Sequence, residues 1–471
     1  MDAKIFFGSS EATAESFSER KSPFSGKVVS RAPICTPEMA QKALKIAQNA
    51  TVAAKASTLA QRCNWLLDVA SKLREQKEDI AKTITDEVGK PIAFARIEVE
   101  RCIETVTLSA ETMRTMHGET INTDAMNSGK KTTAFFTRVP AGVVVAITPF
   151  NFPLNLVAHK LAPALVAGNT VVLKPTPEAP LTAYKFAKLF IESAYAIPDA
   201  LSVVYGDAEV GSALITSDIP RVISFTGSVP VGKIITKNAG IKKVSLELGG
   251  NAATYIDASA DLDLAAQRCA LGAFVNSGQV CISLQRIYVH GDVYETFSQK
   301  MAEASKQLVV GSPYEESTFM GPLIDDEAAI RAMSWVESAV KEGAVALLEP
   351  HCEGRMFYPC VMANVRDDMA IVCEEVFAPI VSLVKVENFD DAYPRMNNSP
   401  YGLQFSLFTN DLKLTQRAIY ELDAGGIIIN DMPTLRFDIQ PYGGVKLSGV
   451  GREGPKFAIE EMSEIKSVII C

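Results

Sequence analysis

The sequence predicts an α/β protein built from at least two domains. Its 471 residues exceed what one ordinary hydrophobic core holds. From residue 143 onward, short runs rich in β-branched residues alternate with segments of helical length. Strand, helix and strand in this order predict a parallel sheet, with ligand sites at the carboxyl ends of the strands.

The first third of the chain is predicted to be mainly helical. Apolar residues recur at helical spacing from Arg62 to Val88, and Gly89-Lys90-Pro91 ends the pattern. A second amphipathic stretch covers roughly residues 91–116. Residues 118–131 are polar and poor in large apolar side chains, which predicts a loop or an exposed hairpin tip.

The next hundred residues are predicted to form four strands and two helices. The strands are expected at residues 143–147, 170–173, 201–204 and 222–225. The helices are expected at residues 154–167, closed by Gly168, and 181–194, opened by Pro180.

A second α/β unit is predicted to begin near Ala252. A helix over residues 261–274 leads toward Cys281. Later strands are expected at residues 286–289, 380–386, 403–408 and 426–429. The tail, residues 465–470, is a further apolar strand with nothing after it to cover it. Because strand edges are usually paired or hidden, we expect this strand to add to a sheet in a partner subunit.

Composition excludes several classes of partner. The net charge is −9 and the chain has no block rich in lysine or arginine, so extended nucleic-acid or anionic-membrane contact is not expected. Nine cysteines form no C-x-x-C pair, which indicates a reducing compartment. The start has no secretory pattern, and no apolar run is long enough to span a bilayer. We therefore expect a soluble cytoplasmic protein.

Cys281 and Glu247 are the candidate pair for covalent catalysis. Cys281 follows a predicted helix and a glycine, which places it at a backbone corner, and Glu247 ends an apolar run before two glycines. A thiolate is a strong nucleophile near neutral pH, and a partly desolvated carboxylate can deprotonate water. A single cysteine in such a position is more often a buried apolar residue than a nucleophile, and that is the role assigned to the other eight cysteines. The four histidines show no ligand spacing, so no metal is assigned.

Four glycine-marked segments are candidate ligand sites. Residues 225–233 lie between a strand and an expected helix, where backbone N–H groups bind phosphate. The spacing Gly227 to Gly232-Lys233 fits a phosphate-binding loop, but Ile234 replaces the hydroxyl that would hold magnesium. A tight turn without ligand is the alternative. The other segments, each weak alone, are Lys174-Pro175, residues 374–377 and residues 440–446.

Seven motifs, in order and at these spacings, resemble the aldehyde dehydrogenase superfamily across essentially the full chain. They are Thr148-Pro149-Phe150-Asn151-Phe152-Pro153, Lys174-Pro175, Phe225-Thr226-Gly227-Ser228, Glu247-Leu248-Gly249-Gly250, Gly278-Gln279-Val280-Cys281, Glu375-Val376-Phe377 and Tyr442-Gly443-Gly444-Val445-Lys446. The resemblance implies a Rossmann-like cofactor domain (residues 1–117 and 140–250), an α/β catalytic domain (251–445) and a small β oligomerisation arm (118–139 and 446–471). It also implies a homodimer or homotetramer.

The resemblance implies roles for individual residues. Cys281 matches the nucleophile, Glu247 the base that activates water, and Asn151 the amide that stabilises the oxyanion with the Cys281 N–H. The positions matched to dinucleotide binding are Thr148, Pro149, Lys174 (adenosine ribose), Gly227, Ser228 (pyrophosphate), Gly232, Glu375 (nicotinamide ribose) and Phe377 (beside the nicotinamide).

One departure from the family pattern concerns the cofactor. Relatives that prefer NAD usually carry a glutamate three residues after the lysine matched by Lys174. Here Pro177 occupies that position and the glutamate is displaced to Glu178. A 2′-phosphate is repelled less without that carboxylate, so NADP or dual use is predicted alongside NAD.

A second departure concerns the substrate. Residues 430–438 and 451–455 resemble the branch with lactaldehyde, phosphonoacetaldehyde and non-phosphorylating glyceraldehyde-3-phosphate dehydrogenases. Relatives acting on phosphorylated or phosphonylated aldehydes tend to carry arginine before the nucleophile, where this chain has Val280. A small neutral or hydroxylated aldehyde is therefore favoured. Arg436 either pairs with a substrate carboxylate, as in a semialdehyde, or locks its loop against Asp438, which is slightly favoured.

Hydrolytic oxidation of an aldehyde to its carboxylate is the leading hypothesis. CoA-acylating oxidation is the alternative among enzymes, and Glu247 argues against it because relatives of that type often lack the base. A structural or binding protein of the same fold is the alternative from another class. Retention of Asn151, Glu247 and Cys281 together argues against that loss of activity.

Overall fold

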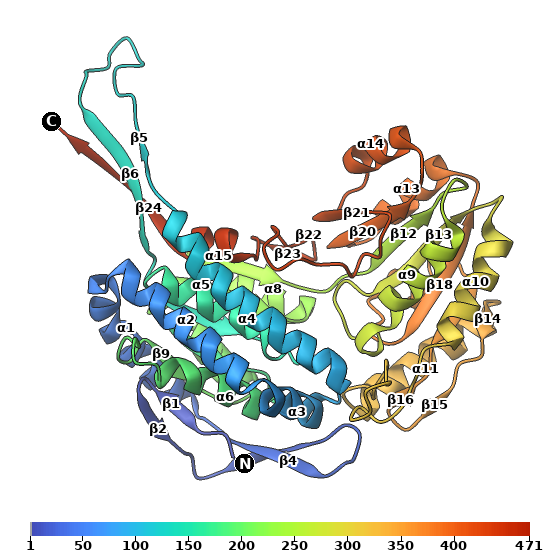
Figure 1. The fold of residues 1–471 in the computed structure, drawn as a ribbon, viewed down its shortest axis with the longest axis horizontal. Helices are drawn as coiled ribbons and strands as arrows, with labels where there is room; N and C mark the ends of the chain where they lie inside the picture. The colour runs from blue at the N-terminus through green and yellow to red at the C-terminus, as the bar shows by residue number, and fades with distance from the viewer. Residues whose placement is uncertain (1) are drawn as a thin grey trace.

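The computed structural model describes residues 2–471 and places two large sheets in two lobes (Figure 1). The first sheet has the order β2-β1-β9-β8-β7-β10-β11-β23. These strands are β2 (Ser10–Ala12), β1 (Ile5–Phe7), β9 (Leu201–Val203), β8 (Thr170–Lys174), β7 (Val143–Ile147), β10 (Val222–Thr226), β11 (Lys243–Glu247) and β23 (Gly449–Val450). The five central strands, β9 to β11, are parallel, which confirms the predicted parallel α/β sheet.

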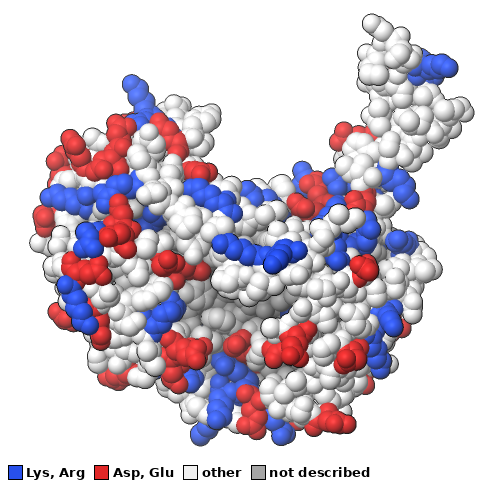
Figure 2. Space-filling model, turned by 180° about the vertical axis from the view of Figure 1, so that it is seen from behind, with Lys and Arg blue, Asp and Glu red and all other residues white. Residues whose placement is uncertain are grey.

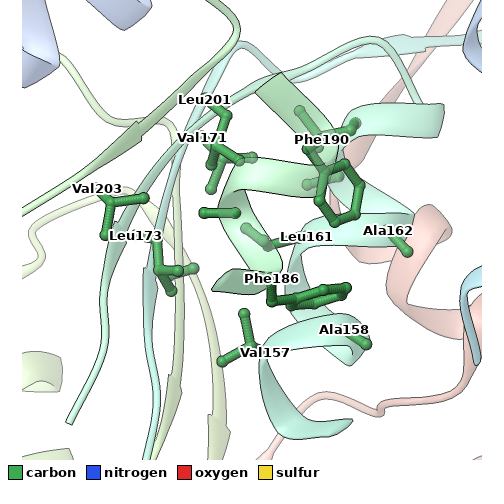
Figure 3. Close-up of a cluster of buried hydrophobic side chains, with 14 of the residues drawn as sticks. Val157, Ala158, Leu161, Ala162, Val171, Leu173, Phe186, Phe190, Leu201 and Val203 are labelled. Carbon is green, nitrogen blue, oxygen red and sulfur yellow. The ribbon is translucent and has the colours of Figure 1, made fainter. Parts of the chain in front are cut away.

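Helices cover both faces of the first sheet. On one face lie α5 (Asn155–Val166) and α6 (Pro180–Ile191), behind which pack α2 (Leu59–Glu75), α3 (Lys77–Val88) and α4 (Ile92–Thr115). Figure 3 shows Phe186 of α6 and Leu161 of α5 beside Leu173 of β8 in this core. On the other face lie α1 (Pro37–Ala56) and α7 (Ala208–Thr216), and the Thr170 hydroxyl donates to the Ala47 carbonyl of α1 at 2.8 Å.

The helix predicted from residue 62 to 88 is two helices, α2 and α3. Gln76 separates them with φ −104° and ψ 13°, and its N–H bonds to the Lys72 carbonyl. No glycine or proline marks this break, and the helical spacing of apolar residues continues across it. The sequence pattern therefore predicts one helix where the structure has two. The turn lets α3 pack against both α4 and α6. Helix α1 and the N-terminal strands, including the hairpin of β3 (Phe17–Lys21) and β4 (Val28–Pro33), were not predicted.

The second sheet has the order β14-β17-β18-β13-β12-β20-β21. The strands are β14 (Val345–Leu348), β17 (Cys360–Ala363), β18 (Ile380–Val386), β13 (Leu284–His290), β12 (Ala252–Ile256), β20 (Gln404–Phe408) and β21 (Gly426–Ile429). All pairs are parallel except β14 with β17. The four strands predicted here are confirmed, whereas β12, β14 and β17 were not predicted. The helices are α9 (Leu262–Phe274), α10 (Tyr294–Lys306), α11 (Asp326–Lys341), α12 (Ala370–Cys373), α13 (Phe389–Asn397) and α14 (Leu412–Glu421).

A three-stranded arm extends away from the body (Figures 1 and 2). It has the order β24-β6-β5, with β24 (Ser463–Ile470), β6 (Thr133–Pro140) and β5 (Glu119–Thr120). The hairpin predicted around residues 118–131 is confirmed by the pairing of β5 with β6. The tail strand, predicted to be bare, instead pairs with β6 of its own chain over its full length.

Strand β24 still leaves one edge of the arm open, because it is the last strand in the order. Ile465, Ile469 and Ile470 on it are exposed. That a partner subunit covers this edge stays a prediction, which light scattering of the full chain tests. The domain limits also stay a prediction, although β23 joins the first sheet rather than the arm.

Short elements complete the chain. They are α8 (Val229–Asn238), the 3₁₀ turn η1 (Val275–Gly278), β15 (Cys352–Glu353), β16 (Met356–Phe357), β19 (Tyr401–Gly402), β22 (Val445–Lys446) and α15 (Pro455–Glu461). Among residues 2–471, no helix has the length and apolar character needed to cross a bilayer.

Candidate active site

One cavity of about 320 Å³ gathers most of the predicted site residues. Its wall includes Pro149, Asn151, Gly227, Ser228, Glu247, Cys281, Glu375, Phe377 and Arg436, all of them predicted. It also includes Phe150, Leu156, Thr226, Leu248, Gly249, Tyr442 and Glu453. The surface view shows a hollow between the two lobes, edged by acidic and basic side chains (Figure 2).

Cys281 follows a sharp backbone corner, as the sequence predicts. Helix α9 ends at Phe274, and Asn276, Ser277 and Gly278 then take φ values of 52°, 56° and 72°. Such left-handed conformations are costly for residues other than glycine and occur where the surroundings enforce them. A side chain at position 278 would approach the Ala378 carbonyl oxygen to 2.3 Å, so only glycine fits. The corner turns Cys281 toward the cavity.

Asn151 lies beside the loop that carries the nucleophile. Its Nδ2 donates to the Gln279 carbonyl at 3.1 Å, which leaves one amide hydrogen for another acceptor. The backbone carbonyl of Asn151 accepts a hydrogen bond from Lys90 Nζ at 2.7 Å. Lys90 also pairs with Glu98, and both side chains are buried. The Glu98 carboxylate accepts the Leu154 N–H at 2.9 Å, so this ion pair fixes the chain around Asn151.

Replacing Lys90 with methionine should destabilise the fold by about 3–5 kcal/mol, because it leaves the buried Glu98 carboxylate without its partner. Equilibrium unfolding in urea measures this loss. The matched control is Lys77→Met, which breaks a partly exposed pair with Glu100 and should cost about 1 kcal/mol or less. Equal losses in the two variants would contradict a structural role for the buried pair.

Glu247 ends β11 inside the cavity wall. It is buried, and neither carboxylate oxygen has a hydrogen-bond partner among the described residues. Burial raises the pKa of Glu247 well above 4.5, and repulsion from Glu453 raises it further, against the opposing charges of Arg436, Lys160 and Arg452. A carboxyl group with a raised pKa and no internal partner is equipped to exchange a proton with a small molecule.

Glu453 is the second buried carboxylate and behaves in the opposite way. Lys160 Nζ lies 3.0 Å from one of its oxygens, and Arg436 Nη2 lies 3.1 Å from the other. Burial alone would raise the pKa of Glu453, but Lys160, His159 and Arg436 hold it below its usual value. When the pKa values of two neighbouring carboxyl groups are driven apart, one group can remain ionised while the other exchanges a proton.

Arg436 is anchored mainly by Glu453. The predicted ion pair with Asp438 is present at 3.8 Å, and the contact with Glu453 is a second, shorter ion pair of 3.1 Å. The guanidinium lies over the Tyr442 ring, 3.7 Å from its centroid, and the side chain is 8% exposed. Its buried Nε has no hydrogen-bond partner among residues 2–471. The loop is therefore locked by ion pairs with two buried carboxylates, Asp438 and Glu453.

Cys281 Sγ lies 3.0 Å from Tyr442 Oη. Burial raises the pKa of the thiol to about 12, whereas the Tyr442 hydrogen bond and the charge of Arg436 lower it. Tyr442 occurs in a predicted motif, but the sequence assigned it no role.

Glu375 and Phe377 form the opposite wall of the cavity. Glu375 Oε1 accepts the Gly250 N–H at 2.9 Å, and a side chain at position 249 would collide with that carboxylate. Burial raises the pKa of Glu375 to about 7. Phe377 lies edge-on to Phe150, with ring centroids 6.0 Å apart. These two residues come from the segment between α12 and β18 of the second sheet.

The remaining predicted residues lie outside this wall. Lys174 and Thr148 end neighbouring strands, and the Thr148 N–H donates to the Lys174 carbonyl at 3.3 Å. Gly232 packs in the first turn of α8 against Leu248, whose side chain would have to move to admit a larger residue. Val280 is buried in an apolar cluster and is absent from the cavity wall, so its side chain does not meet a ligand there.

Several site residues were not predicted at all. They are His159, Lys160, Glu453, Lys90 and Glu98. The available signal was the pair His159-Lys160 inside an otherwise apolar helical segment, since buried charges in such a position require partners. Glu453 and Lys90 stand in loops whose sequence pattern says nothing about burial.

Known proteins share this architecture. The sequence pattern of the aldehyde dehydrogenase family matches residues 9–468. A 3-sulfolactaldehyde dehydrogenase from Priestia aryabhattai is 45% identical over 411 residues, covering 87% of this chain and 86% of that protein. A lactaldehyde dehydrogenase from Methanococcus maripaludis is 38% identical over 452 residues, covering 95% of this chain and 96% of that protein.

Solved structures agree with the sequence comparison. The NADP-dependent glyceraldehyde-3-phosphate dehydrogenase of Bacillus halodurans, complexed with NADP, has a TM-score of 0.98 at 31% identity, covering 100% of this chain and 99% of that one. Family pattern, relatives and fold coincide over nearly the whole length. The chain belongs to the aldehyde dehydrogenase family.

Proposed function

We propose that this enzyme oxidises a small aliphatic or hydroxylated aldehyde, such as lactaldehyde, to its carboxylate with NAD or NADP. The observation that carries this proposal is that a thiol and an unpartnered buried carboxyl, Cys281 and Glu247, line one small cavity. That pair supplies a nucleophile and a base for a two-stage reaction through a covalent intermediate.

In the first stage, the Cys281 thiolate adds to the aldehyde carbon and gives a thiohemiacetal. The free amide hydrogen of Asn151 and the Cys281 N–H are the donors for the oxyanion. A bound dinucleotide supplies the acceptor for the hydride that leaves this carbon, and a thioester on Cys281 remains. In the second stage, Glu247 takes a proton from water and the hydroxide displaces Cys281 as the acid forms.

Several features support a dinucleotide in the neighbouring loops. Ser228 precedes α8 without capping it, so the N–H groups of Val229 and Val231 in the first turn remain available to a phosphate, whereas Pro230 has none. In this proposal Glu375 and Phe377 contact the nicotinamide ribose and ring, and Lys174 contacts the adenosine ribose. Pro177 is exposed, and it stands three residues after Lys174, in the position where a carboxylate would repel a 2′-phosphate. The structural neighbour complexed with NADP adds support for NADP use.

The substrate proposal rests on the cavity and the relatives. A volume of about 320 Å³ shared with the nicotinamide end favours a short aldehyde. The lactaldehyde dehydrogenase relative supports a hydroxylated one. A second candidate is a short aldehyde with an anionic tail, because the cation of Arg436 lines the cavity and one relative is named for 3-sulfolactaldehyde.

An aldehyde panel tests this proposal with each dinucleotide. Lactaldehyde, succinate semialdehyde and glyceraldehyde 3-phosphate are compared by the absorbance of the reduced cofactor. We expect kcat/KM for lactaldehyde to exceed that for glyceraldehyde 3-phosphate by about tenfold or more, and NADP to support turnover within about a hundredfold, or 3 kcal/mol, of NAD. A higher kcat/KM for the phosphorylated aldehyde would contradict the substrate proposal. A stronger NAD preference would contradict the proposal for the cofactor.

A further inference from the structure

Tyr442 is the one side chain, among the described residues, that hydrogen-bonds the sulfur of Cys281. We propose that Tyr442 is a catalytic residue whose hydroxyl donates a hydrogen bond to the Cys281 thiolate, before the thiolate attacks and again when it leaves the thioester. The inference rests on the proposed role of Cys281 as the nucleophile. Cysteine nucleophiles are commonly activated by a histidine or a nearby cation; among residues 2–471 no histidine or cation hydrogen-bonds this sulfur, and Arg436 acts on it only through its charge.

The position of the hydroxyl is fixed by the backbone. The Tyr442 N–H donates to the Glu453 carbonyl at 3.1 Å, and the Glu453 N–H donates back at 2.6 Å. The ring is 3% exposed and packs in one apolar cluster with Val280, Ile282 and Leu403. A side chain held in this way cannot swing out of reach of the sulfur, so the contact persists without substrate.

Arg436 strengthens the hydroxyl as a donor. Its guanidinium lies over the ring at 3.7 Å, and a cation on the ring face draws electron density away from the phenol oxygen. Burial and the neighbouring Cys281 still raise the pKa of Tyr442 well above 10, so the hydroxyl keeps its proton near neutral pH. A neutral phenol is the donor that a thiolate requires.

The hydrogen bond follows the charge on sulfur through the reaction. When the C–S bond forms, the electron pair of the thiolate moves into that bond and the hydrogen bond weakens. When hydroxide adds to the thioester, Glu247 holds the proton from water. The C–S bond then breaks and its electron pair returns to Sγ, where Tyr442 donates again. Tyr442 keeps its own proton in both stages, so the step consumes no further reactant.

Tyr442→Phe removes the hydroxyl and keeps the ring beneath Arg436. The test measures alkylation of Cys281 by iodoacetamide across a range of pH, with the modified peptide quantified by mass spectrometry. Losing one hydrogen bond to a charged group should raise the thiol pKa by about 1–2 units, and because a more basic thiolate is also more nucleophilic, alkylation should slow by about three- to tenfold. kcat/KM for lactaldehyde should fall by about tenfold.

The matched control is Tyr255→Phe on β12, whose ring packs against Phe389 outside the cavity. It should leave the alkylation of Cys281 and the turnover unchanged. Alkylation of Cys281 at the wild-type rate across the pH range in Tyr442→Phe would overturn the proposal, even if turnover fell. Because alkylation needs no aldehyde, this outcome is distinct from a failure of the proposed function, in which a variant without Cys281 would still oxidise aldehydes.

Discussion

Replacing Cys281 with alanine should lower aldehyde oxidation by about 10⁴-fold or more, because no other group at the cavity can form the thiohemiacetal from which hydride leaves. Dinucleotide binding should persist, since the residues proposed to hold the cofactor lie on other loops. Absorbance of the reduced dinucleotide measures the first quantity, and quenching of protein fluorescence by added dinucleotide measures the second.

The matched control for this variant is Cys352→Ala. Cys352 lies on β15, away from the cavity wall, and its thiol is only partly buried. Its replacement should leave oxidation within about twofold of wild type, as expected for a substitution away from the site. Oxidation that survived in Cys281→Ala would refute the assignment of the nucleophile.

Replacing Glu247 with glutamine should lower steady-state turnover by about 10²- to 10⁴-fold, because water then has no base beside the thioester. The first stage, in which hydride leaves, involves no hydrolysis and does not need that base. One equivalent of reduced dinucleotide should therefore still appear as a burst. Stopped-flow absorbance separates the burst from the slow steady state. Steady-state turnover close to wild type would show that another group activates water.

The same variant should also change how the rate of thioester hydrolysis depends on pH. Burial and Glu453 raise the pKa of Glu247 well above 4.5, so the carboxyl stays protonated at pH values where an exposed glutamate is already ionised. Only the ionised form can accept a proton from water, so hydrolysis in the wild type should rise as pH rises through this higher pKa. In Glu247→Gln that rise should disappear. The control Glu337→Gln, on the exposed side of α11, should keep the wild-type profile.

Strands and helices with a clear period could be predicted from the sequence, whereas pairing and breaks could not. The runs at 143–147 and 222–225 were recognisable as buried strands from their β-branched residues, but nothing in them says that they pair with each other. The break at Gln76 has no glycine or proline to announce it, and it forms because α3 packs against two helices. The tail strand carried the right pattern, but the pattern does not say that its partner is β6 of the same chain.

The site shows the same division. Gly278 and Glu247 were identifiable because each stands at a point where the local pattern changes. The network around Glu453 was not, since Lys160 lies 293 residues before Glu453 in the sequence and meets it only in the folded chain. Val280 was assigned to the substrate from its place next to the nucleophile, yet the corner turns Cys281 toward the cavity and Val280 into the core.

The central claim is that a thioester forms on Cys281 and that Glu247 is needed to hydrolyse it. Mass spectrometry of Glu247→Gln, quenched after mixing with lactaldehyde and the preferred dinucleotide, tests this claim most directly. The account predicts one lactyl adduct per chain on the peptide that contains Cys281, matched by one equivalent of reduced dinucleotide. Reduced dinucleotide without an adduct, or an adduct on a different cysteine, would contradict it.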